Sequence, residues 1–209
     1  LFKRNKKYQV TIFERNNSIN LKEGYGIQLS VNSIKLLNKI QFDKLENNEK
    51  FNPDKINFYS VENFSKICEL NISDFNTENC KYTTLKRSSL INFLKKDLEK
   101  EIKFDHTISK IEQQDQIVKI TFENNEIYEL DYLIISDGVF SKSKNLLSKN
   151  QIKPKFNDTL AIRGIIPSSS NIADKKNISL FLGSNFHYVI YPVSSCLLYT
   201  SDAADDTPC

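Results

Sequence analysis

An acidic residue closes the first readable strand of this sequence. Residues 8–13, Tyr-Gln-Val-Thr-Ile-Phe, have the β-branched and aromatic content that is typical of a strand, and Glu14 and Arg15 follow directly. In dinucleotide-binding βαβ units, the acid that ends the second strand accepts hydrogen bonds from ribose hydroxyls. Glu14 is therefore a candidate nucleotide-binding residue. The alternative is a solvated charge that merely ends a strand.

A second candidate pair lies at the end of an apolar run. Residues 132–136, Tyr-Leu-Ile-Ile-Ser, predict a central parallel strand, and the run stops at Asp137 and Gly138. Open α/β sheets bind ligands beyond the carboxyl ends of their strands. Asp-Gly is also common in ordinary turns, so the pair alone leaves both interpretations open.

Two further polar residues, His187 and Tyr191, are four positions apart in a strand-like run. Because side chains alternate along a strand, both project from the same face. An imidazole can exchange a proton near neutral pH and therefore suits a general base. The alternatives are an exposed or structurally satisfied histidine and a tyrosine that only packs in the core.

Two helices are expected near these residues. Residues 24–29, Gly-Tyr-Gly-Ile-Gln-Leu, form a glycine-containing loop that leads into a helix with Asn32 as its N-cap and with Ile34, Leu37 and Ile40 on one face. A second helix follows Arg87, with Ser88 or Ser89 as its cap. Its apolar face consists of Leu90, Phe93, Leu94 and Leu98.

The remaining segments predict strands. Loose alternation from Lys55 to Ile72 indicates strands outside a nucleotide-binding sheet, and residues 104–129 indicate a meander with a turn at Asn124–Asn125. Two more strand regions are expected at residues 159–166 and 178–193.

Composition excludes several classes of protein. The chain has 209 residues and 39% hydrophobic content, which is enough to bury a core. Its net charge of +3 comes from 29 basic and 26 acidic residues without a basic stripe, so nucleic acid is not an expected partner. No apolar run approaches the ~20 residues of a membrane span, residues 1–7 do not resemble a signal peptide, and we expect a cytoplasmic location.

Both ends of the sequence are expected to be interrupted. The chain begins at Leu1 and contains no Met, and a glycine-rich turn about 20 residues before Glu14 would lie upstream. Residues 196–205 resemble one reading frame of a sequencing-library adapter, so we expect residues 196–209 to be non-native and to stand outside the fold. The alternative is a natural Ala/Asp-rich tail. Cys68 and Cys80 are expected to be reduced thiols.

In this order, the segments resemble the FAD-dependent aromatic-ring hydroxylases of the para-hydroxybenzoate hydroxylase type, especially the salicylate hydroxylase and hydroxynicotinate monooxygenase branch. The resemblance covers nearly all of residues 1–195. Residues 12–15 are similar to the family's second strand with its ribose-binding Glu, and residues 24–33 to its Gly-x-Gly-Ile-x-Leu-x-Pro-Asn segment, with Val31 in place of proline. Residues 86–90 resemble an Arg-x-x-Leu stretch whose arginine reaches the FAD.

Two more segments carry the resemblance. Residues 135–144 match the family's Asp-Gly motif, although Ile135, Ser136 and Lys144 depart from it, and a lysine loses the guanidinium fork of the usual arginine. Residues 163–167 and the Gly-x-x-x-His-x-x-x-Tyr-Pro-Val run at residues 183–193 resemble strands of the substrate-binding sheet, where the His and the Tyr face the aromatic ring.

The resemblance implies an α/β fold, with a partial Rossmann-like FAD-binding part at about residues 1–50 and 80–150 and an interleaved substrate sheet at about residues 51–79 and 155–195. His187 is the implied base, with Tyr191 beside the substrate, and no metal is implied. The implied cofactor-binding residues are Glu14, Arg15, Gln28, Arg87, Asp137 and Gly138.

The implied activity is oxygenation of a small phenolic or N-heteroaromatic acid with FAD as cofactor and NADH or NADPH as co-substrate. One alternative is a ubiquinone-pathway ring hydroxylase, against which the His-x-x-x-Tyr-Pro run argues. Another is a flavin-binding reductase or relative without oxygenation chemistry. Since the glycine-rich phosphate loop is missing from this sequence, we expect the fragment to bind FAD poorly and to be inactive.

Overall fold

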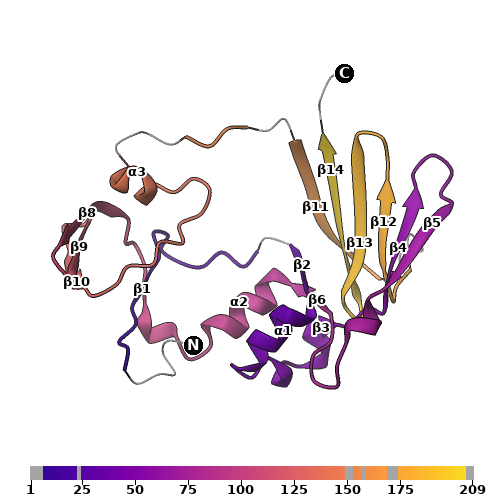
Figure 1. Ribbon diagram of the computed structural model, residues 1–209, viewed down its shortest axis with the longest axis horizontal. Helices are drawn as coiled ribbons and strands as arrows, with labels where there is room; N and C mark the ends of the chain where they lie inside the picture. The colour runs from indigo at the N-terminus through magenta and orange to yellow at the C-terminus, as the bar shows by residue number, and fades with distance from the viewer. Residues whose placement is uncertain (1–6, 23–24, 149–152, 157–158, 169–173, 206–209) are drawn as a thin grey trace. The chain divides into compact units, whose positions relative to one another are not determined.

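The computed structural model describes residues 7–22, 25–148, 153–156, 159–168 and 174–205 (Figure 1). The chain divides into two units, each treated by itself below. Unit 1 comprises Leu1–Ile19 and Asp97–Asn157, and unit 2 comprises Asn20–Lys96 and Asp158–Cys209. These bounds differ from the expected division, because β3 and β6 contact β13 and belong to unit 2. The expected functional roles of the two parts stay a prediction.

Unit 1 is built on short strands. Strand β1 (Ile12–Phe13) pairs in parallel with β7 (Ile102–Lys103), which follows the 3-10 turn η4 (Glu99–Glu101). Strands β8 (Ile108–Gln114), β9 (Ile117–Phe122) and β10 (Ile127–Leu130) form an antiparallel sheet in the order β10-β9-β8. The predicted meander is confirmed, with Asn125 in the left-handed region at φ 67°. The strand predicted at residues 8–13 is only two residues long.

An aromatic cluster holds β1 against this meander. The Phe13 ring lies 4.7 Å from the Phe122 ring and 4.9 Å from the Tyr128 ring, between centroids. His106 completes the cluster at 4.8 Å from Phe122, and its Nε2 lies 3.2 Å from Glu126 Oε2. This packing fixes the end of β1, and therefore the position of Glu14.

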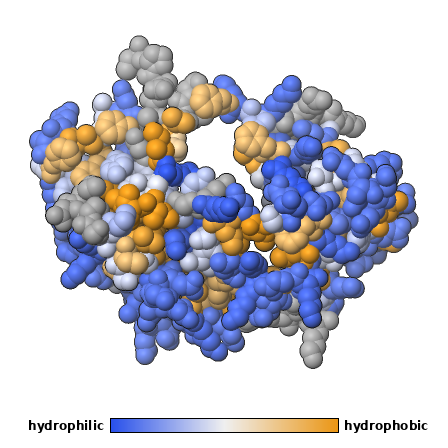
Figure 2. Space-filling model, turned by 180° about the vertical axis from the view of Figure 1, so that it is seen from behind, coloured by the Kyte–Doolittle hydropathy of each residue, from blue (hydrophilic) through white to orange (hydrophobic). Residues whose placement is uncertain are grey.

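The prediction of a central strand at residues 132–136 is wrong. This run forms no strand, and Tyr132 and Ile134 are 83% and 72% exposed. A strand needs a hydrogen-bonded neighbour, and none of the described strands of unit 1 pairs with this run. Hydrophobic residues accordingly reach the surface among hydrophilic ones (Figure 2). The chain then enters the short helix α3 (Ser143–Leu147).

Unit 2 contains a six-stranded sheet in the order β11-β14-β13-β12-β4-β5 (Figure 1). In chain order the strands are β4 (Lys55–Ser60), β5 (Lys66–Asn71), β11 (Thr159–Pro167), β12 (Ile178–Leu182), β13 (Phe186–Ser194) and β14 (Leu197–Asp205). Only β12 and β4 are parallel; the other neighbours are antiparallel. The strands predicted at residues 55–72, 159–166 and 178–193 are confirmed, the last as a hairpin.

A second, three-stranded sheet of unit 2 has the order β2-β6-β3. Strand β2 (Gly26–Leu29) leads into α1 (Val31–Asn38), and β6 (Thr83–Lys86) leads into α2 (Arg87–Lys95). Strand β3 is Lys50–Phe51, and the 3-10 turns are η1 (Phe42–Lys44), η2 (Asn47–Glu49) and η3 (Ile72–Phe75). Ile34, Phe42 and Leu85 form its buried core.

Both predicted helix caps are wrong by two or three residues. The N-cap of α1 is Ser30 instead of Asn32, and that of α2 is Lys86 instead of Ser88 or Ser89. The Arg87 backbone N–H donates to the Tyr25 carbonyl at 2.7 Å, which extends the β2–β6 ladder to the first residue of the helix. The helix therefore begins directly where the strand ends.

Residues 197–205 belong to the fold. Leu197–Asp205 forms β14 between β11 and β13, with Leu198 fully buried and Tyr199 5% exposed. The expectation that this segment stands outside the fold was wrong, because its Leu-Leu-Tyr-Thr run has the apolar and β-branched content of a strand. Its non-native origin stays a prediction. Cys68, Cys80 and Cys196 are free thiols.

Within the described residues, no helix has the length and apolar character to cross a bilayer. The same part of the chain holds no group of three or more His, Cys, Asp or Glu side chains that could ligate a metal ion.

Candidate functional site

The sequence-predicted site residues fall into two sets. Glu14, Arg15, Asp137 and Gly138 lie in unit 1, whereas Gln28, Arg87, His187 and Tyr191 lie in unit 2. Each set is built up within its own unit below.

Glu14 is half-buried and held at the end of a parallel strand. Its backbone N–H donates to the Lys103 carbonyl at 2.8 Å, which continues the β1–β7 ladder by one residue. Its Oε1 accepts a hydrogen bond from the backbone N–H of Asn16 at 2.9 Å. The carboxylate is thus oriented by its own loop at the carboxyl end of β1, and the adjacent Arg15 is exposed. This is where a ribose-binding acid is expected.

Asp137 and Gly138 shape the turn that starts α3. The Oδ2 of Asp137 accepts from the backbone N–H of Ser143 at 3.2 Å. Burial acts to raise the pKa of Asp137, but hydrogen bonds from Ser141 and Ser143 prevail and hold that pKa below its usual value. Gly138 has φ 82°, a conformation that favours glycine. The carboxylate therefore stabilises this turn, while the predicted cofactor role of both residues stays a prediction.

Replacing Asp137 with alanine should loosen the start of α3. We expect the free energy of local opening at the Ser143 amide to fall by about 1 kcal/mol, because a helix N-terminal N–H loses its acceptor. The pKa of Asp137 is depressed below its ordinary value of 3.8. This stabilisation is therefore present at pH values above 3.8 and is lost as the pH falls through the folded-state pKa. Amide exchange of Ser143 measures both effects. An equal change in an Asp131→Ala control, or none in Asp137→Ala, would contradict the assignment.

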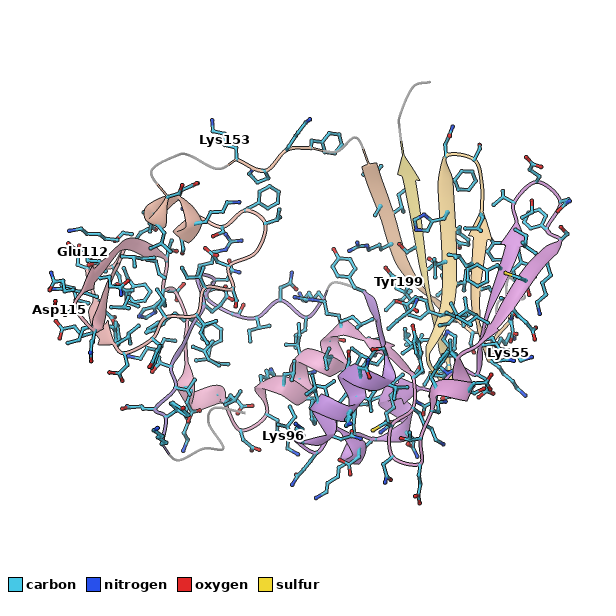
Figure 3. The ribbon with its side chains drawn as sticks, viewed as in Figure 1. Lys55, Lys96, Glu112, Asp115, Lys153 and Tyr199 are labelled. Atoms are coloured by element: carbon cyan, nitrogen blue, oxygen red, sulfur yellow. The ribbon has the colours of Figure 1, made fainter. Side chains whose placement is uncertain are left out.

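Unit 2 gathers tyrosines around Gln28. Tyr191 on β13 and Tyr199 on β14 are register partners, and both are buried. Their ring centroids are 4.9 Å apart (Figure 3, Tyr199). The Tyr82 hydroxyl donates to Gln28 Oε1 at 2.7 Å. The Gln28 side chain also acts on the Tyr191 phenol, whose pKa it lowers. Tyr82 and Tyr191 belong to the same core cluster.

Tyr191 is held in its neutral form. Burial raises the pKa of its phenol well above the ordinary value, and the neighbouring Tyr199 acts in the same direction. The Gln28 side chain and the charge of Arg163 act against this rise without cancelling it. At neutral pH Tyr191 can consequently donate a hydrogen bond but cannot act as a phenolate.

Gly26 allows this close packing. A Cβ at residue 26 would lie 2.7 Å from the Tyr191 hydroxyl and 2.6 Å from Cγ of Tyr199. Any larger residue would displace both rings. Gly26 is therefore required by space. The predicted loop at residues 24–29 is wrong for residues 26–29, which form β2, and Gly24 lies outside the described residues.

Arg87 combines a free guanidinium with a helix N-terminus. It is the half-buried first residue of α2, and the first turn of that helix contains no acidic residue. Among the described residues, its guanidinium has no hydrogen bond or ion pair. Backbone N–H groups at a helix N-terminus carry partial positive charge and bind anions. Arg87 is thus suited to a phosphate group.

His187 lies on the same strand as Tyr191 but in a different environment. It is exposed and pairs with Leu182 of β12, whereas Tyr191 is buried. Regular alternation along β13 places both side chains on one face, with their Cα atoms about 13 Å apart at the usual strand rise. The predicted shared face is therefore present, and the predicted chemistry stays a prediction.

Sequence reasoning missed Tyr82, Tyr199 and the role of Arg163. The Arg163 guanidinium lies 5.0 Å over the ring of Tyr25. Strand alternation could have assigned Arg163 to a face, but only the register of β11 with β14 shows that this face is shared with Tyr199. Tyr82 carries no recognisable signal in the sequence.

No protein-family model matches the chain. In sequence, the chain is similar to 6-hydroxynicotinate 3-monooxygenase of Bordetella bronchiseptica (strain ATCC BAA-588 / NCTC 13252 / RB50), with 21% identity over 148 residues. That match covers 69% of this chain and 38% of the monooxygenase.

Several solved structures share the fold. The 2,6-dihydroxypyridine-3-hydroxylase from Arthrobacter nicotinovorans superimposes with a TM-score of 0.78 at 14% identity, over 98% of this chain and 53% of that chain. Klebsiella pneumoniae HpxO complexed with FAD and uric acid gives 0.81 at 13% identity, over 94% and 50%. A salicylate hydroxylase substrate complex gives 0.73 at 17% identity, over 88% and 49%. The chain spans about half the length of these structures.

Proposed function

Since the chain has the fold of the FAD-dependent aromatic hydroxylases, we propose that it is part of a flavin monooxygenase acting on small aromatic acids. The proposed reaction inserts one oxygen atom into a phenolic or N-heteroaromatic acid and consumes NADH or NADPH. The observation that carries this proposal is the buried Tyr191, which packs in one cluster with Tyr82 and Tyr199 and lies on the same strand face as His187.

Each unit contains a residue whose chemistry suits one part of an FAD molecule. In unit 1, Glu14 would bind the ribose hydroxyls, since its carboxylate is oriented at a strand end. In unit 2, Arg87 would bind a phosphate, because its guanidinium has no acidic partner in the described part of the chain and α2 begins without an acidic residue. When bound, FAD supplies the activation of oxygen after reduction by NADH or NADPH.

The protein side chains would prepare the aromatic ring. A phenolic ring becomes more electron-rich when it loses its proton, and the exposed imidazole of His187 would accept that proton directly or through water. Tyr191 would donate a hydrogen bond to the substrate, because its raised pKa keeps it protonated. The packing of Tyr191 against Tyr199 would exclude water from this part of the site.

The test separates an oxygenase from its alternatives. The whole gene product that contains this chain is reconstituted with FAD and supplied with 6-hydroxynicotinate, salicylate or a prenylated phenol. Oxidation of NAD(P)H with a matching amount of hydroxylated small acid supports the proposal. Oxidation without a hydroxylated product would identify a non-oxygenating reductase, and hydroxylation of the prenylated phenol alone would identify a ubiquinone-pathway type of enzyme.

We further propose that the 209-residue chain by itself retains little FAD and has no hydroxylase activity. It spans about half the length of the solved relatives. We expect well under one FAD per chain after purification, measured by flavin absorbance against protein concentration, with the whole gene product as control. Stoichiometric flavin on the short chain would overturn this expectation.

A further inference from the structure

The backbone of Tyr82 is fixed by two asparagine side chains. Its N–H donates to Asn76 Oδ1 at 2.7 Å, and its carbonyl accepts from Asn52 Nδ2 at 2.9 Å. The same Asn52 Nδ2 donates to Thr83 Oγ1 at 2.9 Å. Both backbone polar groups of Tyr82 are therefore held at the residue that precedes β6. The hydroxyl that Tyr82 donates to Gln28 Oε1, at 2.7 Å, is thus carried by a fixed part of the chain.

The Gln28 side chain projects from the face of β2 that lies against Tyr191. Gln28 and Gly26 are two residues apart on this strand, so their side-chain positions share a face. A Cβ at Gly26 would lie 2.7 Å from the Tyr191 hydroxyl, which shows how closely this face approaches the phenol. Tyr82 packs against the core cluster that contains Tyr191. The Gln28 carboxamide is therefore held at one end by Tyr82 in the surroundings of Tyr191.

The two ends of a carboxamide have opposite hydrogen-bonding character, since the carbonyl accepts and the NH2 group donates. The Gln28 carbonyl oxygen accepts from Tyr82, which leaves the NH2 group for a second partner. Gln28 lowers the pKa of the Tyr191 phenol. A donor near a phenol oxygen has this effect because it stabilises the phenolate, whereas a carbonyl there would raise the pKa. The direction of the pKa change therefore agrees with the orientation that Tyr82 imposes.

We propose that Tyr82 is a positioning residue of the candidate site, which holds the Gln28 carbonyl, directs the Gln28 NH2 group toward Tyr191 and so leaves the Tyr191 hydroxyl proton free for the substrate. This inference rests on the proposed function and deepens it. With the carboxamide reversed, the Gln28 carbonyl would itself accept the Tyr191 hydroxyl proton. A substrate oxygen would then lose its donor.

The first test removes one hydroxyl group. Tyr82→Phe keeps the ring that packs in the cluster and loses the hydrogen bond to Gln28. In the FAD-loaded whole gene product, the Kd values of 6-hydroxynicotinate and salicylate are measured from flavin absorbance changes. We expect both Kd values to rise roughly 2- to 12-fold, with a smaller change in kcat, because a hydrogen bond to the bound substrate is weakened.

A double-mutant cycle distinguishes positioning from a general effect on the fold. In a Tyr191→Phe background there is no hydroxyl proton to direct, so Tyr82→Phe should leave the Kd values of that background unchanged. A residue that only stabilises the fold would raise them by the same factor in both backgrounds. Gln28→Glu should weaken binding although Tyr82 is intact, since a carboxylate only accepts hydrogen bonds.

A control and a spectroscopic measurement accompany the cycle. Tyr188→Phe removes a hydroxyl from the opposite face of β13 and should keep the native Kd values. The exchange of the Gln28 side-chain NH2 protons with solvent is followed by NMR without substrate. It should become faster in Tyr82→Phe, because the carboxamide loses the bond that orients it.

The outcomes separate this inference from the proposed function. Native Kd values and native NH2 exchange in Tyr82→Phe, or an equal rise in Kd in the Tyr191→Phe background, would overturn the role of Tyr82 and leave the monooxygenase proposal standing. If neither probe stimulates NAD(P)H oxidation in the native protein, the proposed function fails and the role of Tyr82 toward a substrate fails with it.

Discussion

Replacing Gly26 with alanine should lower the free energy of unfolding of unit 2 by about 1–3 kcal/mol, because the added methyl group overpacks the core. Its Cβ would lie 2.6 Å from Cγ and 2.8 Å from Cβ of Tyr199, and 2.7 Å from the Tyr191 hydroxyl. The contacts to Tyr199 involve atoms next to the backbone, so rotation of a flexible side-chain end cannot relieve them. Urea-induced unfolding measures the loss.

Gly164 provides a matched control in the same unit. A Cβ at this position of β11 would meet nothing nearer than Thr200 Oγ1 at 3.5 Å, which is an ordinary contact. We therefore expect Gly164→Ala to change the free energy of unfolding by less than about 0.5 kcal/mol. If both alanine variants unfold at the same urea concentration as the native protein, the close approach at Gly26 is wrong.

Replacing His187 with alanine should lower kcat by roughly 10²- to 10⁴-fold in the FAD-loaded whole gene product, which is the usual contribution of a general base. Substrate binding and unfolding should change little, because the His187 side chain is exposed. Rapid-quench measurement of product formation reports the chemical step, and substrate Kd is measured separately.

The pH dependence distinguishes a base from a residue that only contacts the substrate. As the pH rises toward the pKa of the substrate's own hydroxyl group, the substrate loses its proton without help, so the activity of His187→Ala should recover toward that of the native protein. Asn185→Ala, an exposed change close to the start of β13, should keep native kcat at all pH values. A constant deficit of His187→Ala across the pH range would show that His187 is not the base.

Local sequence patterns identified most elements whose neighbours are close in the chain. The meander at residues 104–129 and the hairpin of β4 and β5 carry their own alternation and turns, so they form as expected. The run at residues 132–136 failed because its apolar character predicts a buried strand without saying which strand pairs with it. The start of α2 was displaced because the ladder between β2 and β6 extends as far as Arg87.

For the candidate site as well, the sequence predicted local features and the structure was needed for contacts between distant segments. From sequence alone, periodicity placed Glu14 at a strand end and His187 with Tyr191 on one strand face, because strand periodicity is a local property. The roles of Arg87, His187 and Tyr191 came from the family resemblance. Which residues of distant segments meet is a matter of register and packing. The tertiary structure therefore decided that Gly26 lies against Tyr191 and Tyr199, and that Arg163 joins their face from β11.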